Sequence, residues 1–239
     1  NHIFDKGERG YNATVSGYDS LGVAHTGVYR DKAEQDSLNP YITEIRGVKF
    51  SFINFTYGTN IGAKKARVNR MDSLSVLSAI QRARKNSDFI VALPHWGVEY
   101  SLTPSPQQKK WEKFLYSQGV DMIIGSHPHV VQPVNYILDN SGAIKHLTAY
   151  SLGNYISNMS AKNTQIGFIF VVSIVKDDKG CRIVSGEPIW LWCARGGRFE
   201  KNYTTLIIKD YKDHPEAFPI RHEYDNMIST YNRLREIIN

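Results

Sequence analysis

Two histidines one residue apart, His127 and His129, are the strongest sign of chemistry in the sequence. They follow the apolar segment 120–124, which we expect to be a short buried strand, so the pair lies in the loop at the carboxyl end of that strand. Open α/β sheets bind their ligands at this edge. Neutral imidazole is the commonest metal ligand in proteins, so the pair indicates a metal site. The structural alternative is a turn stiffened by Pro128.

His95 has the same position relative to an earlier strand, expected over residues 88–93, and His2 lies beside Asn1. Three histidine-bearing segments are better explained by a metal centre than by chance. The alternative for His95 is a loop histidine held by hydrogen bonds, and the alternative for His2 is a frayed terminus. No cysteine takes part, so nitrogen and oxygen donors would select Zn, Mn or Fe. Two such ions would clamp the attacking and leaving oxygens of a phosphoryl transfer.

Regular elements must position these side chains, and hydrophobic periodicity predicts them. Helices are expected over residues 7–20, 72–85, 106–118 and 222–238. Strands are expected in a hairpin over 43–56, singly over 88–93 and 120–124, and in hairpins over 134–151 and 167–192. The first half resembles a βαβ pattern and the second half is antiparallel. The sequence therefore predicts an α/β (α+β) fold, with two packed β-sheets flanked by helices, as a single domain over residues 1–239.

Composition narrows the class of protein. Apolar residues make up 41% of the chain, and no run of 18 apolar residues exists, so we expect a globular protein with no membrane span in this chain. The net charge of +6 comes from dispersed residues, with a small cluster at 64–67 that we expect to be solvated, and nucleic-acid binding is not expected. Cys181 and Cys193 are expected to be free thiols.

Four motifs occur in one order: NHIFDKG over residues 1–7, PHWGVEY over 94–100, GSHPHV over 125–130 and YSLGNY over 150–155. Together they resemble the capsule-synthesis CapA family, which is associated with poly-γ-glutamate capsules and is similar in fold to the calcineurin-like metallophosphoesterases. The resemblance implies a metallophosphatase-like αββα sandwich. It also implies that the family's amino-terminal strand is missing from this chain.

The resemblance assigns roles to individual residues. Asn1 looks like an amide ligand, and His2 looks like a general acid or phosphate contact. His95 and His127 would share one divalent metal with Asn1, and His129 would bind the other. The family's acidic ligands, one of which bridges the metals, would precede this chain.

Two further residues of the motifs, Glu99 and Asn154, would contact substrate at the rim of the cleft. A solvent-exposed carboxylate and a simple turn residue are the alternatives for them.

The expected function is therefore capsule or poly-γ-glutamate biosynthesis with a metal-dependent, phosphoesterase-like hydrolase site. The alternative is an accessory protein without catalysis, which binds an anionic capsular polymer or helps to assemble and export it. Expected partners are an anionic polymer or phosphoester and other capsule-synthesis proteins. The expected location is the cell surface or another extracytoplasmic site, with any membrane anchor in a segment outside this chain.

Overall fold

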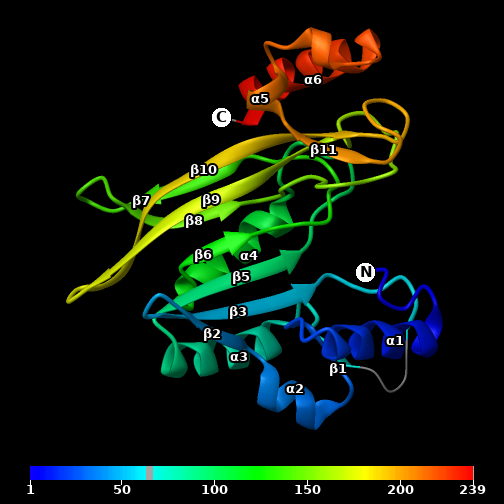
Figure 1. The fold of residues 1–239 in the computed structure, drawn as a ribbon. Coiled ribbons are helices and arrows are strands. Elements are labelled where there is room, and N and C mark those ends of the chain that lie inside the picture. The colour runs from blue at the N-terminus through cyan, green and yellow to red at the C-terminus, as the bar shows by residue number, and fades with distance from the viewer. Residues whose placement is uncertain (63–66, 239) are drawn as a thin grey trace. The chain divides into compact units, whose positions relative to one another are not determined.

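The computed structural model describes residues 1–62 and 67–238, and the side chains of the basic cluster at 64–67 lie outside the described residues (Figure 1). Its mixed α/β class, with two larger sheets flanked by helices, confirms the prediction. The chain divides into two compact units. The first comprises residues 1–96, 112–123 and 176–181, and the second comprises residues 97–111, 124–175 and 182–239. This division does not test the single domain expected over residues 1–239, which stays a prediction.

The regular elements follow the predicted ones closely, with several short additions. In chain order they are α1 (Gly7–Ser20), β1 (Val28–Tyr29), α2 (Lys32–Leu38), β2 (Tyr41–Ile45), β3 (Val48–Thr56), β4 (Arg67–Val68), α3 (Ser73–Asn86), β5 (Phe89–His95), α4 (Pro106–Ser117), β6 (Met122–Ile124), β7 (Val134–Leu138), β8 (Ile144–Ala149), β9 (Ile166–Asp177), β10 (Gly180–Ala194), β11 (Thr204–Ile207), α5 (Ile208–Tyr211), the 3₁₀ helix η1 (Pro215–Ala217) and α6 (Arg221–Ile238).

Parallel strands form the centre of the first unit. β3 pairs with β5, and β5 pairs with β6, both in parallel register. β2 joins β3 as an antiparallel hairpin whose turn residues, Arg46 and Gly47, have φ of 51° and 79°. Two positive φ values are those of a type I′ turn, which matches the twist of the two strands. The predicted hairpin around Gly47 is therefore confirmed.

Helix α3 connects the parallel strands and covers one face of β3 and β5 (Figure 1). It begins where predicted because Asp72 caps it: the carboxylate accepts a hydrogen bond from the Ser75 backbone N–H at 2.9 Å. Val76, Ile80 and Ala83 lie one turn apart on the helix and are buried. Burial of this apolar stripe stabilises the helix against the sheet.

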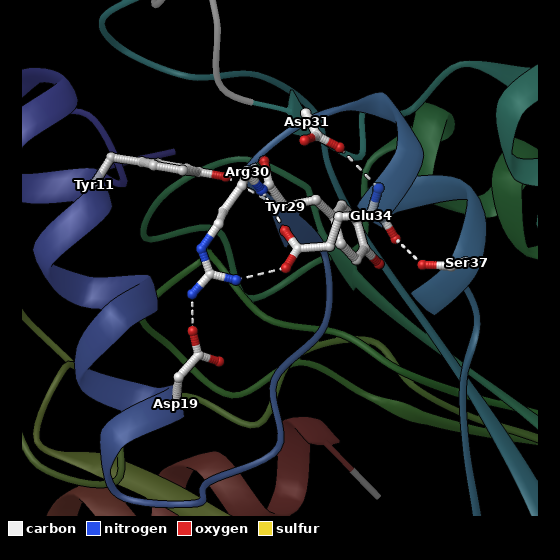
Figure 2. A network of polar contacts seen from close by, with 7 residues as sticks. All are labelled: Tyr11, Asp19, Tyr29, Arg30, Asp31, Glu34 and Ser37. Atoms are coloured by element: carbon white, nitrogen blue, oxygen red, sulfur yellow. Dashed lines mark hydrogen bonds and ion pairs between the residues drawn. The ribbon is translucent and has the colours of Figure 1, made fainter.

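Helix α1 is held by polar contacts to the segment before α2 (Figure 2). The Tyr11 hydroxyl donates to the Tyr29 carbonyl at 3.0 Å and accepts from the Tyr29 N–H at 2.9 Å. The Arg30 guanidinium contacts the carboxylates of Asp19, on α1, and Glu34, on α2. The Tyr11 pair is buried, so it contributes more than the exposed ion pairs. These contacts fix the helix that begins at Gly7, beyond the turn that follows Asn1 and His2.

The second unit is antiparallel. β9, β10 and β11 form a three-stranded sheet in the order β11-β10-β9, and β7 pairs with β8. The β7–β8 hairpin packs on β10, where the Tyr136 hydroxyl donates to the Gly186 carbonyl at 2.8 Å. Helix α6 buries an apolar stripe against the three-stranded sheet. This core includes Ile166, Phe168, Trp192, Leu206, Met227 and Leu234.

Short elements were not predicted, namely β1, β4, α2, β11, α5 and η1. Each spans seven residues or fewer, so a hydrophobic period has little length in which to appear. Cys181 and Cys193 are free, as expected. Among the helices of residues 1–62 and 67–238, none combines the length and apolarity needed to cross a bilayer.

Asp121 gives the first unit a characteristic pH dependence. Its carboxylate accepts a hydrogen bond from the Ile90 N–H at 2.7 Å, while burial raises the pKa of this carboxyl from 3.8 to about 6. Between these values the folded protein binds more protons than the unfolded chain, so this group's contribution to stability falls as pH rises. We expect the unfolding free energy of the wild type, relative to that of Asp121→Asn, to fall by up to about 3 kcal/mol as pH rises from ~4 to ~7.

Urea denaturation across that pH range measures this difference. Asp88→Asn is the matched control, because the hydrogen bond from Lys176 lowers the pKa of Asp88. The contribution of Asp88 is therefore present above its ordinary pKa and is lost as pH falls, with the opposite sign. A wild-type to Asp121→Asn difference that stays constant with pH would contradict the assignment.

Candidate functional site

The first unit places His95 at the end of β5. The sequence put this histidine in a loop after a strand over 88–93, but β5 continues to His95, which pairs in register with Thr56 of β3. The extension is explained by the backbone, since the Tyr57 N–H donates to the His95 carbonyl at 3.0 Å. Pro94 is tolerated within this parallel pair. The histidine therefore lies on a rigid strand end.

Asn1 and His95 are brought together, as the resemblance implied. The Asn1 Oδ1 atom lies 2.9 Å from His95 Nε2, and its Nδ2 donates to the Tyr57 hydroxyl at 3.3 Å. The Tyr57 ring stacks on the His95 imidazole, with centroids 6.3 Å apart and an interplanar angle of 12°. Because a carbonyl oxygen only accepts, the neutral His95 ring donates its Nε2–H to Asn1. Tyr57 was not predicted at this site.

His2 is paired with a carboxylate. Its Nδ1 lies 2.6 Å from Asp5 Oδ2, and 60% of the His2 side chain is exposed. The Asn60 amide lies 3.4 Å from the same ring nitrogen. Phe4 holds this turn in place, since it is buried and stacks on Tyr11 with centroids 4.9 Å apart. An exposed imidazole oriented by a carboxylate has the form of a general acid or base.

The second unit gathers three donors of metal-ligand type. Glu99, His127 and His129 each offer one ligand atom, and these three atoms lie within 4.8 Å of one another. Glu99 is exposed, His129 is half-buried, and His127 is 7% exposed. The sequence predicted the two histidines as ligands and Glu99 as a substrate contact. The structure also places a Glu99 carboxylate oxygen within 4.8 Å of a nitrogen of each histidine, so Glu99 joins the candidate ligands, and its substrate contact stays a prediction.

The loops that carry these donors have unusual backbone conformations. Tyr100, His127 and His129 have φ of 65°, 110° and 60°, a region that side chains with a Cβ rarely occupy. The Tyr100 N–H donates to the Pro128 carbonyl at 2.8 Å, which joins the two loops. The Tyr100 ring also stacks on His129, with centroids 6.3 Å apart. The contact brings Glu99, the neighbour of Tyr100, to the histidine pair.

Asn154 orients His129. Its Nδ2 donates to the Thr164 carbonyl at 2.9 Å, so its Oδ1 faces His129 Nδ1 at 3.1 Å. That nitrogen therefore carries the proton, and the lone pair of neutral His129 is on Nε2. This is how ligating histidines are commonly prepared for a metal. Gly153 permits the turn, because its φ is 69° and a Cβ at this position would lie only 2.6 Å from the Ile166 carbonyl oxygen.

Two buried glutamines support the Glu99 loop. Gln108 Nε2 donates to Gln132 Oε1 at 2.8 Å, and Gln108 Oε1 accepts the Ser105 N–H at 2.9 Å. Gln132 Nε2 donates to the Ser101 carbonyl at 2.8 Å. The pair thus ties the segment after Glu99 to the strand-like segment after His129. No sequence signal marked these residues, because glutamines on loops and helices are usually exposed.

A family model described as bacterial capsule synthesis protein PGA_cap matches residues 1–159, which is well over half of the chain. The chain belongs to this family. The assignment made from the four motifs is thereby confirmed. All seven predicted site residues fall within the matched segment.

Two curated relatives belong to Bacillus species. The capsule biosynthesis protein CapA of Bacillus anthracis is 29% identical over 198 residues, covering 79% of this chain and 46% of the relative. The PGA biosynthesis protein CapA of Bacillus subtilis (strain 168) is 26% identical over 184 residues, covering 75% and 47%. The chain thus spans about half the length of these relatives.

Among solved structures, a Staphylococcus aureus protein assigned as a 5′-nucleotidase has a TM-score of 0.42 and 14% identity, covering 70% of this chain and 32% of that one. Such a low score does not establish a common fold. The metallophosphatase-like sandwich stays a prediction from the motifs.

The donors of the second unit fit a divalent metal. A carboxylate and two imidazoles are oxygen and nitrogen ligands of the kind that Zn, Mn and Fe accept, and the Asn154 contact prepares one imidazole for coordination. Asn1 and His95 form a second, separate donor pair in the first unit. A metal shared by His95 and His127 would join different units and stays a prediction.

The buried glutamine pair yields a test of the site's scaffold. Gln108→Leu leaves Gln132 Oε1 and the Ser105 N–H without their partner, so we expect unfolding to become easier by about 2–4 kcal/mol. Gln107→Leu is the control, because Gln107 is an exposed neighbour on the same helix, and its effect should stay within about 0.5 kcal/mol. Urea denaturation of both variants measures this. Equal effects would show that the pair does not stabilise the loop.

Proposed function

We propose that this capsule-synthesis protein carries a divalent-metal hydrolase site of the phosphoesterase type. The observation that supports this most directly is the convergence of Glu99, His127 and His129 within 4.8 Å. The family supports a role in capsule biosynthesis, and the names of both relatives refer to capsule or PGA biosynthesis. The substrate is then a phosphoester or an anionic capsular polymer, and other capsule-synthesis proteins are the proposed partners. The proposed location is extracytoplasmic.

In this proposal Glu99, His127 and His129 hold one ion, and Asn1 and His95 form a separate pair of candidate ligands in the first unit. A bound Zn, Mn or Fe supplies Lewis-acid chemistry, polarising the phosphoryl group and making water a better nucleophile at neutral pH. The chain's own residues do the rest. The Asn154 oxygen fixes the His129 tautomer, which leaves Nε2 available as a ligand atom.

His2 is the proposed general acid. Its Nδ1 faces the Asp5 carboxylate at 2.6 Å, which orients the ring. The other ring nitrogen, Nε2, then carries the proton that goes to the leaving oxygen. The exposure of the side chain allows a large substrate to reach it.

The role of Asn154 predicts a loss of metal affinity on mutation. Asn154→Ala removes the acceptor that sets the His129 tautomer, so we expect Mn²⁺ or Zn²⁺ to bind about 10–100-fold more weakly. Asn226→Ala is the control, because Asn226 on α6 also contacts a histidine, the exposed His222, at 3.2 Å. Isothermal titration calorimetry of the full chain measures both. An unchanged dissociation constant in Asn154→Ala would refute the assigned role.

The role of His2 predicts a dependence on the leaving group. A general acid contributes about 100-fold or more where the leaving oxygen needs a proton, and far less where it leaves as a stable anion. In a metal-loaded enzyme, His2→Gln should therefore slow phenyl phosphate hydrolysis by about 100-fold and p-nitrophenyl phosphate hydrolysis much less. His222→Gln, on an exposed face of α6, should change neither rate.

Equal losses with both substrates would remove His2 from the acid role. The accessory function makes a different prediction for the wild type. If the wild type binds metal and a polyanion yet hydrolyses neither phenyl phosphate nor p-nitrophenyl phosphate with Zn, Mn or Fe, that result would favour the accessory role over the hydrolase.

A further inference from the structure

The first unit contains a cavity of about 550 Å³ that none of the predicted site residues lines. It lies between α2, the first half of α3 and the second half of β3, and its volume is in the range of small-molecule sites. It borders the carboxyl half of β3, a strand of the parallel pair. The lining is mainly polar, which indicates a polar occupant.

Asn39 presents an unpaired acceptor in this lining. The residue is 7% exposed, and its Oδ1 atom is buried with no hydrogen-bond partner among the described residues. Its backbone carbonyl accepts a bond from Arg82 Nε at 2.8 Å, so the residue is held in place. A buried carbonyl without a donor is destabilising, because its lost hydrogen bond to water has not been replaced. A ligand with an N–H or O–H group would supply that bond once the Asn39 amide turns its Oδ1, which is closed off from solvent, toward the cavity.

Two guanidinium groups in the lining lack an acidic partner. Within the described part of the chain, neither Arg70 nor Arg82 has a carboxylate at ion-pair distance. Arg70 donates to the Thr59 hydroxyl at 2.6 Å, and Arg82 donates to the Ser78 hydroxyl at 2.8 Å. Each guanidinium has five N–H donors, so both retain donors for a ligand.

The acidic residues of the lining are already engaged. Asp36 forms an ion pair with Lys32, and Asp72 caps α3 through the backbone and hydroxyl of Ser75. The uncompensated charge that remains is positive, and the amino-terminal end of α3 adds to it. The positive charge favours a ligand with an anionic group, and the acceptor at Asn39 favours one that also has a hydrogen-bond donor.

We propose that this cavity binds a small carboxylate or phosphate that also carries an N–H or O–H donor, such as a hydroxy acid, an amino acid or hydrogen phosphate. The anionic group contacts Arg70 and Arg82, and the donor bonds to Asn39 Oδ1. The proposal does not depend on the hydrolase site, because it uses none of the same side chains.

Calorimetric titration of the full chain tests this, with metal removed by chelation and the chelator removed by gel filtration. L-Malate and succinate differ by one hydroxyl, so malate should bind about fivefold or more tightly if Asn39 receives a donor. Inorganic phosphate is the third probe. Saturable phosphate binding with malate no tighter than succinate would identify phosphate as the ligand.

Variants locate the binding. Arg82→Gln and Arg70→Gln should each weaken binding about tenfold, while Arg84→Gln, an exposed neighbour on α3, should not. Arg70 is exposed, so its variant keeps the test valid even if Arg82→Gln unfolds. His129→Gln should leave binding unchanged, which separates this site from the metal ligands. No saturable binding of any probe below about 10 mM, or equal effects of Arg70→Gln and Arg84→Gln, would overturn the proposal.

Discussion

The candidate metal site depends on the backbone at His127 and His129, which has positive φ values of 110° and 60°. Residues with a Cβ rarely adopt such values. Such conformations cost about 1–3 kcal/mol each and persist only where the surrounding structure enforces them. Here the enforcement comes from the next residues, since Val130 and Val131 are fully buried and the Ser151 hydroxyl donates to the Val130 carbonyl at 2.8 Å. The buried segment therefore holds the imidazoles in place.

Three of the four candidate histidines also have an oxygen partner. Asn154 faces His129, Asn1 faces His95, and in the first turn Asp5 faces His2. An oxygen acceptor fixes both the orientation and the protonated nitrogen of an imidazole. These partners explain how histidines on loops and at strand ends become ordered donors. They also explain why residues beyond the histidines belong in the site.

The sequence predicted most of the fold because long periodic segments indicate their own structure. The α3 helix, with Asp72 as its cap, and the hairpin around Gly47 both appear as expected. Contacts between distant segments could not be predicted in this way. The ring of Tyr57 on His95 and the Gln108–Gln132 bond join residues that no spacing rule connects. Glu99 was found through its motif, but only the fold places its carboxylate with two imidazoles.

The central claim is that Glu99, His127 and His129 bind one divalent metal ion. A crystal of the full chain soaked in MnCl₂ and measured for anomalous scattering tests it most directly. The account predicts one strong peak about 2.0–2.3 Å from an oxygen of Glu99 and a nitrogen of each histidine, with no peak there in Glu99→Gln. The absence of an anomalous peak beside these three side chains would contradict the claim, provided that the MnCl₂ concentration saturates metal binding in solution.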